Sequence, residues 1–252
     1  MLADIARFAL EGMGRADAPY HDADHVVAVS EAARLIVAGR HAAGEAVGVE
    51  DWLHMVAAAL MHDLGYVRGL CPGDGEGRVM TGCGEASVAM PESATDAWLA
   101  PYHVDRGIRV ARARYTGVAG LDVDRLARAI DATRFPPPHG RGAAAGAAAD
   151  GTEPGLVRAA DLIGQFADLH YPRKVAALYA EFAETGEAAV QGYASPADIW
   201  SGFPAFFETV VAPRIGPALA YLDRTAEGRA CRARLELNLS RARAGAPRHV
   251  VE

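Results

Sequence analysis

Histidine and aspartate stand side by side in the stretch ALMHDLGY, which covers residues 59–66. An apolar run that fits a helix reaches this point, so His62 and Asp63 are expected at the end of a buried helix. A carboxylate in an apolar interior is unfavourable unless it is paired or binds a cation. The rest of the chain must therefore supply partners for these two side chains.

Two other segments contain candidate partners. The stretch YHDADH, residues 20–25, provides His21 and His25, which lie four positions apart and would share one face of a helix. The stretch RAADLIGQ, residues 158–165, places Asp161 inside another apolar run. Each of these polar side chains would be stranded in the core without a partner, so we expect them to meet His62 and Asp63.

His25, His62, Asp63 and Asp161 together offer two imidazoles and two carboxylates. A mixed nitrogen and oxygen set suits a divalent ion, and three or four protein ligands leave positions for water and substrate. The sequence therefore predicts one divalent metal ion, with Mn, Fe, Co, Ni, Zn and Mg not distinguished. The predicted ligands are His25, His62, Asp63 and Asp161.

The order H…HD…D and its flanks resemble the HD-domain metal-dependent phosphohydrolases. YHDADHVVAV is similar to the YHNxxHxxxV form found in family members and in cyclic-nucleotide phosphodiesterases. AALMHDLGY is similar to the usual apolar-apolar-HD-apolar-GY segment. IDATRFP and RAADLIGQ are similar to the IxATR and DADLxxxG segments of one bacterial branch. The resemblance covers roughly residues 18–170, and the later residues fit that branch more loosely.

The resemblance implies an all-α HD-domain bundle with the metal between its helices and additional C-terminal helices. It also implies hydrolysis of a small phosphate ester or nucleotide by a metal-activated water, with Asp63 and His21 as the catalytic residues. His21 matches the general acid of phosphodiesterases, a role that suits histidine because its pKa lies near the working pH. The competing interpretation, weighed equally, makes His21 a supporting or surface histidine.

A second metal would need two further histidines, which two-metal family members carry in their middle helices. The corresponding stretch, near Ala89 and Met90, has none. His103 lies in the right region, but APYHVDRG matches poorly, so we expect one metal and keep His103 only as a reserve ligand. The preferred interpretation of His103 is a surface histidine near a helix start.

Four cations are candidates for binding the substrate phosphate. Arg134 follows IDAT and is the first choice, and Arg68 follows HDLGY. Arg173 and Lys174 follow the segment that contains Asp161. Arginine binds phosphate oxygens through two hydrogen bonds, but at least two of the four are expected to be ordinary surface charges.

Composition narrows the partners. The net charge of −7 disfavours nucleic acid, which requires many phosphates to be neutralised, so a small phosphorylated substrate is the expected partner. No apolar run approaches the roughly 20 residues that span a bilayer, and the N-terminus lacks a signal-peptide pattern. We therefore expect a cytoplasmic protein without a membrane partner. The sequence does not determine its oligomeric state, and a homodimer is one of the alternatives.

Nearly every periodic segment fits a helix, and strand-like runs are scarce. Helices are predicted over residues 24–38, 50–64, 92–112, 122–133, 155–168, 172–185, 196–210 and 212–244. Glycine-rich stretches predict flexible loops at 68–92, a candidate lid, and at 136–155. Gly65 is expected to cap the second helix. The predicted organisation is a core over residues 1–170 and a C-terminal helical extension over 171–252, packed on that core.

Three other hypotheses remain open. HD-fold di-iron oxygenases share the expected fold but need two irons. A non-catalytic helical module could keep a structural metal or bind a nucleotide. Finally, His62 and Asp63 could form a buried hydrogen-bonded pair without a metal, which would leave His25 and Asp161 unexplained.

Overall fold

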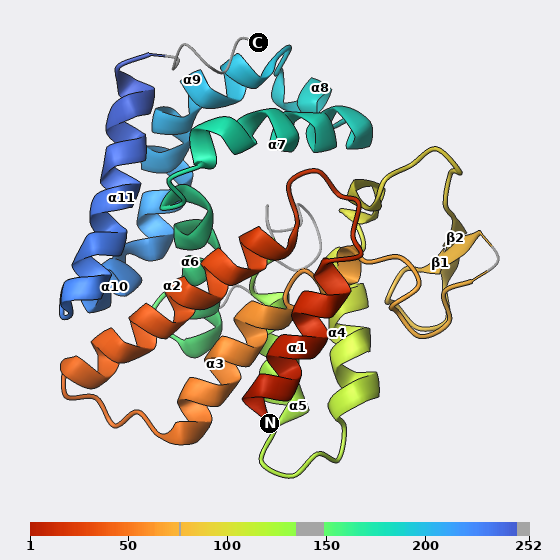
Figure 1. Ribbon diagram of the computed structural model, residues 1–252, viewed down its shortest axis with the longest axis horizontal. Coiled ribbons are helices and arrows are strands. Elements are labelled where there is room, and N and C mark those ends of the chain that lie inside the picture. Colours follow the sequence, from red (N-terminus) through yellow and green to blue (C-terminus); the bar gives the residue numbers. More distant parts are fainter. Residues whose placement is uncertain (76, 135–148, 246–252) are drawn as a thin grey trace.

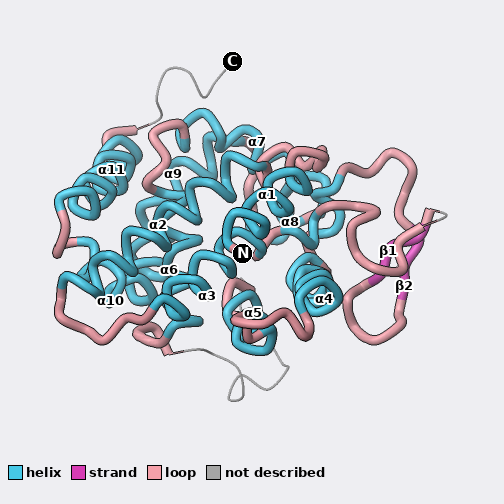
Figure 2. Tube along the Cα trace, turned by 60° about the horizontal axis from the view of Figure 1, so that its bottom comes forward, coloured by secondary structure: helices cyan, strands magenta, loops and turns pink. Residues whose placement is uncertain are grey.

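The computed structural model describes residues 1–75, 77–134 and 149–245, and it is predominantly helical, as predicted. Figure 2 shows helix along most of the chain, and the only sheet in the described part is a two-stranded hairpin. The helices that precede Arg134 are α1 (Leu2–Met13), α2 (Ala23–Ala42), α3 (Val49–Met61), α4 (His103–Tyr115) and α5 (Val123–Asp131). The later helices are α6 (Glu153–Phe166), α7 (Tyr171–Thr185), α8 (Glu187–Gln191), α9 (Pro196–Phe206), α10 (Ala212–Leu222) and α11 (Ala226–Arg243).

The centre of the fold is α2, which packs against α3 on one side and α6 on the other (Figure 1). Its apolar face is completely buried at Val26, Val29 and Ile36. The C-terminal helices reach this centre through α10, which contacts both α2 and α6. The division at residue 170 stays a prediction, but this packing joins the later helices to the helices that carry the motifs.

The helix α3 ends earlier than its apolar pattern predicts. It stops at Met61, and a 3₁₀ turn over Leu64–Tyr66 follows. Gly65 lies within this turn and does not cap the helix, so that expectation is wrong. A Cβ atom at Gly65 would lie 1.7 Å from the carbonyl oxygen of His103. Glycine is therefore required here because the start of α4 packs directly on the turn after His62 and Asp63.

The loop predicted over residues 68–92 contains an antiparallel hairpin, made of β1 (Arg78–Met80) and β2 (Ser87–Ala89). This arm extends away from the helices on the right of Figure 1. Its base is fixed by Arg106, which is fully buried and binds both carboxylate oxygens of Asp74 at 3.0 and 2.9 Å. Arg106 also donates to the carbonyl oxygens of Gly65, Val67 and Met80. Arg106 thus gives the base of the arm defined partners, while the flexibility of residues 68–92 and their role as a lid stay predictions.

Other element boundaries also differ from the predictions. Residues 92–102 were predicted to form the first turns of a helix. They contain only a short 3₁₀ helix, η2 (Asp96–Leu99), and α4 begins after them, at His103. A π-helical turn over Phe207–Val211 separates α9 from α10 next to Pro213, whose missing N–H interrupts the α-helical hydrogen bonds. The loop predicted at 136–155 lies largely outside the described residues. Within the described part, no helix combines the length and the apolar character needed to cross a membrane.

Candidate metal centre

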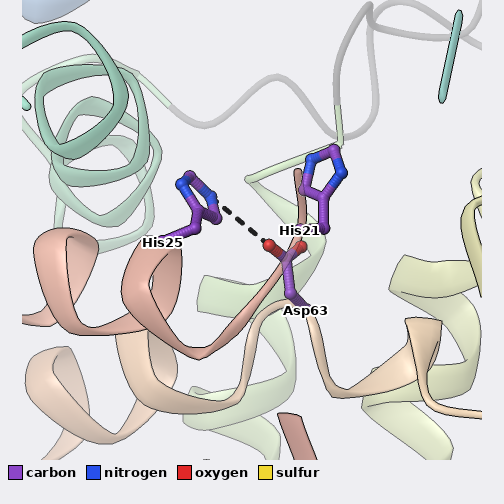
Figure 3. Close-up of side chains that lie close together, drawn as sticks. All are labelled: His21, His25 and Asp63. Carbon is purple, nitrogen blue, oxygen red and sulfur yellow. Dashed lines mark ion pairs between the residues drawn. The ribbon is translucent and has the colours of Figure 1, made fainter. Parts of the chain in front are cut away.

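The four predicted ligands come from three different helices. His25 lies in the first turn of α2, which begins here because the carboxylate of Asp22 accepts a hydrogen bond from the backbone N–H of His25. His62 and Asp63 directly follow the last residue of α3. Asp161 lies in the middle of α6. Figure 3 shows His25 and Asp63 facing each other, with His21 beside them.

Close packing of α2 on α6 brings His25 to Asp161. Gly164 lies one turn after Asp161, and a Cβ atom there would be 2.7 Å from the Cα atom of Val29, one turn after His25. The absence of a side chain at Gly164 thus lets the two helices approach. As a result, Nε2 of His25 lies 3.3 Å from Oδ1 of Asp161.

The distances between the predicted ligand atoms match those expected between atoms that bind the same metal ion. Nε2 of His25 lies 3.4 Å from Oδ2 of Asp63, and Nε2 of His62 lies 3.0 Å from the same oxygen and 3.6 Å from Oδ1 of Asp161. Two atoms bound about 2.1 Å from one metal are about 3.0 Å apart at a right angle and about 3.4 Å apart at the tetrahedral angle. Two overlapping groups, His25 with His62 and Asp161 and His25 with His21 and Asp63, each have their ligand atoms within 4.8 Å of one another, so these histidine and aspartate side chains could hold a metal ion.

Two of these atoms are buried without a hydrogen-bond partner among the described residues. They are Nε2 of His62 and Oδ2 of Asp63, so their 3.0 Å contact is not a hydrogen bond. The other nitrogen of His62, Nδ1, donates to the carbonyl oxygen of Ala59 at 2.8 Å. This bond places one ring proton on Nδ1, so a metal that displaced the second proton would find a lone pair on Nε2. Polar atoms in such a position need a further partner, and a divalent cation satisfies both.

The two carboxylates are held in the charged form that binds metals. Burial would raise the pKa of Asp63, but the imidazole of His62 outweighs burial, and the pKa lies below its ordinary value. The same balance, burial against His62 and His25, lowers the pKa of Asp161. Because a cation is a stronger positive partner than imidazole, a bound metal would stabilise both carboxylates further.

His21 is hydrogen-bonded to Glu181, a residue that the sequence analysis did not single out. Its Nδ1 donates to Oε2 of Glu181 at 2.6 Å, and the backbone N–H groups of Tyr20 and His21 donate to Oε1 at 2.7 and 3.0 Å. Glu181 lies on α7 and is buried. Burial lowers the pKa of His21, but the charge and hydrogen bond of Glu181 outweigh it and raise the pKa to about 9.

His103 lies beside the candidate metal centre and is largely buried, so its interpretation as a surface histidine is wrong. It begins α4, as predicted, but only 17% of its side chain is exposed. Its Nε2 is 3.9 Å from Oδ1 of Asp63, and its Nδ1 donates to the carbonyl oxygen of Ala100. The ring of Tyr66 is stacked between His103 and His21, with both centroid distances at 4.4 Å. Tyr66 thereby fixes both imidazoles beside Asp63.

The two arginines predicted to bind substrate are each held by two aspartates. Arg134 binds both carboxylate oxygens of Asp105 and one of Asp131. Arg68 forms salt bridges with Asp17 and Asp96. Their role in substrate binding stays a prediction, but either guanidinium would have to leave two carboxylates to reach a phosphate.

Comparison with known proteins gives one family. The model of the Npun_R2479-like family matches residues 1–244, and the chain therefore belongs to this family. No match was found among curated proteins or among solved structures.

Proposed function

We propose that this member of the Npun_R2479-like family is a metal-dependent phosphohydrolase of the HD-domain type that acts on a small phosphate ester or nucleotide. The observation that supports the proposal best is that each of the two histidine nitrogens lies 3.0–3.6 Å from an oxygen of both aspartates, with two of these four atoms buried without another partner among the described residues. The order of the ligands along the chain, H…HD…D, is the pattern on which the resemblance to HD-domain enzymes rests.

In this proposal, the metal is held by His25, His62, Asp63 and Asp161. A divalent cation bound there would lower the pKa of a coordinated water and polarise the phosphoryl oxygen. The protein fixes the positions of its ligands through the α2–α6 contact at Gly164 and through the hydrogen bond of His62 to Ala59. Because Asp161 is 20% exposed while His25, His62 and Asp63 are nearly inaccessible, substrate would approach from the side of Asp161.

His21 is proposed to donate a proton to the leaving oxygen. Glu181 occupies its Nδ1 and orients the ring, and 21% of the His21 side chain is exposed, so Nε2 remains available to substrate. The raised pKa keeps the imidazole protonated at neutral pH, and a bound cation would lower that pKa towards the range suited to an acid catalyst. Glu181 is therefore proposed as a positioning residue for His21.

A second candidate function, a di-iron oxygenase, gains support from the position of His103. Its Nε2 faces Oδ1 of Asp63, while Oδ2 of the same carboxylate faces His25 and His62. A carboxylate with different partners on its two oxygens could bridge two metals. The number of metal ions per chain separates this candidate from a one-metal phosphohydrolase.

The test combines elemental analysis with hydrolysis of p-nitrophenyl phosphate and bis(p-nitrophenyl) phosphate, each with and without a chelator. We expect one divalent ion per chain, hydrolysis that the chelator abolishes, and loss of both metal and activity in Asp63→Ala. His41→Ala, at an exposed histidine near the end of α2, is the matched control and should retain both. An Asp63→Ala protein that binds metal normally would overturn the ligand assignment, and a metal-loaded wild type without esterase activity would overturn the proposed reaction.

A further inference from the structure

The chain contains a single lysine, Lys174, against 24 arginines. It lies in the first turn of α7, where 21% of its side chain is exposed. Its Nζ lies 2.8 Å from Oδ2 of Asp168, and this is its only ion pair among the described residues. Lysine carries a compact charge on a flexible stem and is not equivalent to arginine, so a lone lysine in this position calls for an explanation.

A polar row on α6 connects Asp161 with this lysine. Asp161 and Gln165 lie four positions apart and share one face of α6, and Asp168 follows two residues after the helix ends at Phe166. These three residues are partly exposed, whereas all residues between them, 162–164 and 166–167, are buried. Each of the three polar side chains is thus partly accessible to solvent, and the last of them, Asp168, binds Lys174.

The helix α7 places Lys174 on the same side as the candidate acid. Lys174 and Glu181 are seven residues apart, so both lie on one face of α7, and Glu181 binds His21. Seven residues of helix correspond to about 10 Å. Lys174 thus lies two turns of α7 before the residue that binds His21, and its ion-pair partner Asp168 follows Asp161 by seven positions in the chain.

Among the cations predicted to bind substrate, Lys174 has fewer contacts with its carboxylate partner than Arg134 and Arg68 have with theirs. Arg134 and Arg68 each bind two carboxylates, and each makes two hydrogen bonds with one of them. Lys174 makes one contact with one carboxylate, at a partly exposed position. The side chains of Lys174 and Asp168 are 21% and 16% exposed, so an anionic substrate group could approach the ammonium group and replace Asp168 as its partner.

We infer that Lys174 binds a second anionic group of the substrate, away from the phosphate that is hydrolysed. This inference rests on the proposed phosphohydrolase function and narrows its substrate class to phosphate esters that carry a further phosphate or carboxylate. Asp168 holds the ammonium group in place when substrate is absent, and the flexible stem of Lys174 lets the charge turn towards the polar row.

The experiment compares substrates that differ in the second anionic group. The phosphate arm uses adenosine 3′,5′-bisphosphate against adenosine 5′-monophosphate, and the carboxylate arm uses 3-phosphoglycerate against glycerol 3-phosphate. We expect the metal-loaded wild type to prefer at least one of the substrates with two anionic groups. In Lys174→Met, KM for that substrate should rise by roughly tenfold or more, as expected for the loss of one hydrogen bond to a charged group, with kcat changed less than about twofold. Hydrolysis of p-nitrophenyl phosphate, which has no second anion, should be unchanged.

Two further variants separate binding from structure. Arg173→Met removes the neighbouring exposed charge and should leave every KM unchanged. Asp168→Asn releases Lys174 from its partner while the amide oxygen can still accept from the backbone N–H of His170, and it should lower KM for the preferred substrate. An unchanged KM in Lys174→Met, or a wild type that hydrolyses p-nitrophenyl phosphate but prefers no second anion in either arm, would overturn the inference alone. Absence of hydrolysis of any ester by the metal-loaded wild type would overturn the proposed function and the inference together.

Discussion

Oε2 of Glu181 lies 2.6 Å from Nδ1 of His21, although the two residues are 160 positions apart in the chain. The same carboxylate accepts both backbone N–H groups at Tyr20 and His21. A residue of α7 therefore fixes both the ring and the backbone of the segment that precedes α2. The C-terminal helices thus complete the candidate site.

The first prediction is that Glu181→Gln lowers kcat by roughly 10- to 100-fold, the range seen when a partner that orients a site residue is removed. The amide keeps the size of the side chain but loses the charge that orients and protonates His21. Metal content should stay unchanged, because His21 is not among the four proposed ligands. Glu184→Gln is the matched control, since Glu184 lies on the same helix and binds Thr95 through a similar pair of hydrogen bonds. Full kcat in Glu181→Gln would show that His21 is not the acid.

The second prediction concerns pH and the stability of the metal-free protein. The pKa of His21 is raised from its model-peptide value of 6.5 to about 9, so the folded chain binds this proton more tightly than the unfolded chain. The stabilisation is complete below pH 6.5 and is lost as the pH rises to about 9. For a shift of this size the loss amounts to at most about 3 kcal/mol.

Urea unfolding of chelator-treated protein at pH 6 and pH 9 measures this loss. Glu181→Gln, in which the acidic partner of His21 is absent, should show a clearly smaller decrease in the free energy of unfolding over the same interval. Equal decreases in the two proteins would mean that the His21–Glu181 pair does not hold the extra proton.

The third prediction tests the helix contact that assembles the ligands. In Gly164→Ala, the new methyl group would lie 2.7 Å from the Cα atom of Val29, so α2 and α6 must separate. We expect weaker metal binding, because His25 moves away from Asp161, and a loss of about 1–3 kcal/mol in stability from overpacking. Gly216→Ala in α10, where nothing lies within 4 Å of the new atom, should bind metal normally and unfold no more easily. Normal metal affinity in Gly164→Ala would show that this contact does not set the ligand geometry.

The sequence was sufficient to predict the helical class and the four side chains that meet, because each polar residue interrupts an apolar helical pattern. It could not reveal Glu181, since a glutamate on an amphipathic helix is usually exposed and its partner is 160 positions away. The role of Gly164 could not be predicted either. The hydrophobic pattern assigns a residue to a face of its helix but does not identify which other helix packs against that face. His103 was misjudged for a related reason. Its approach to Asp63 depends on the fit of Gly65 against α4, which is a property of the packed structure.

The fourth prediction decides the number of metals. Nε2 of His103 is 3.9 Å from Oδ1 of Asp63, farther than the 3.0–3.6 Å of the contacts that His25 and His62 make with the two aspartates, and it faces the other oxygen of that carboxylate. His103 therefore does not belong to the set around the first ion. Burial lowers its pKa, so at neutral pH it is an uncharged acceptor that stacks on Tyr66 and can receive a hydrogen bond from substrate or water. On this basis His103→Asn should keep one metal ion per chain by elemental analysis and lose activity only moderately. A wild-type protein with two ions, one of which disappears in His103→Asn while Asp63→Ala loses both, would contradict the one-metal assignment and favour the di-iron alternative.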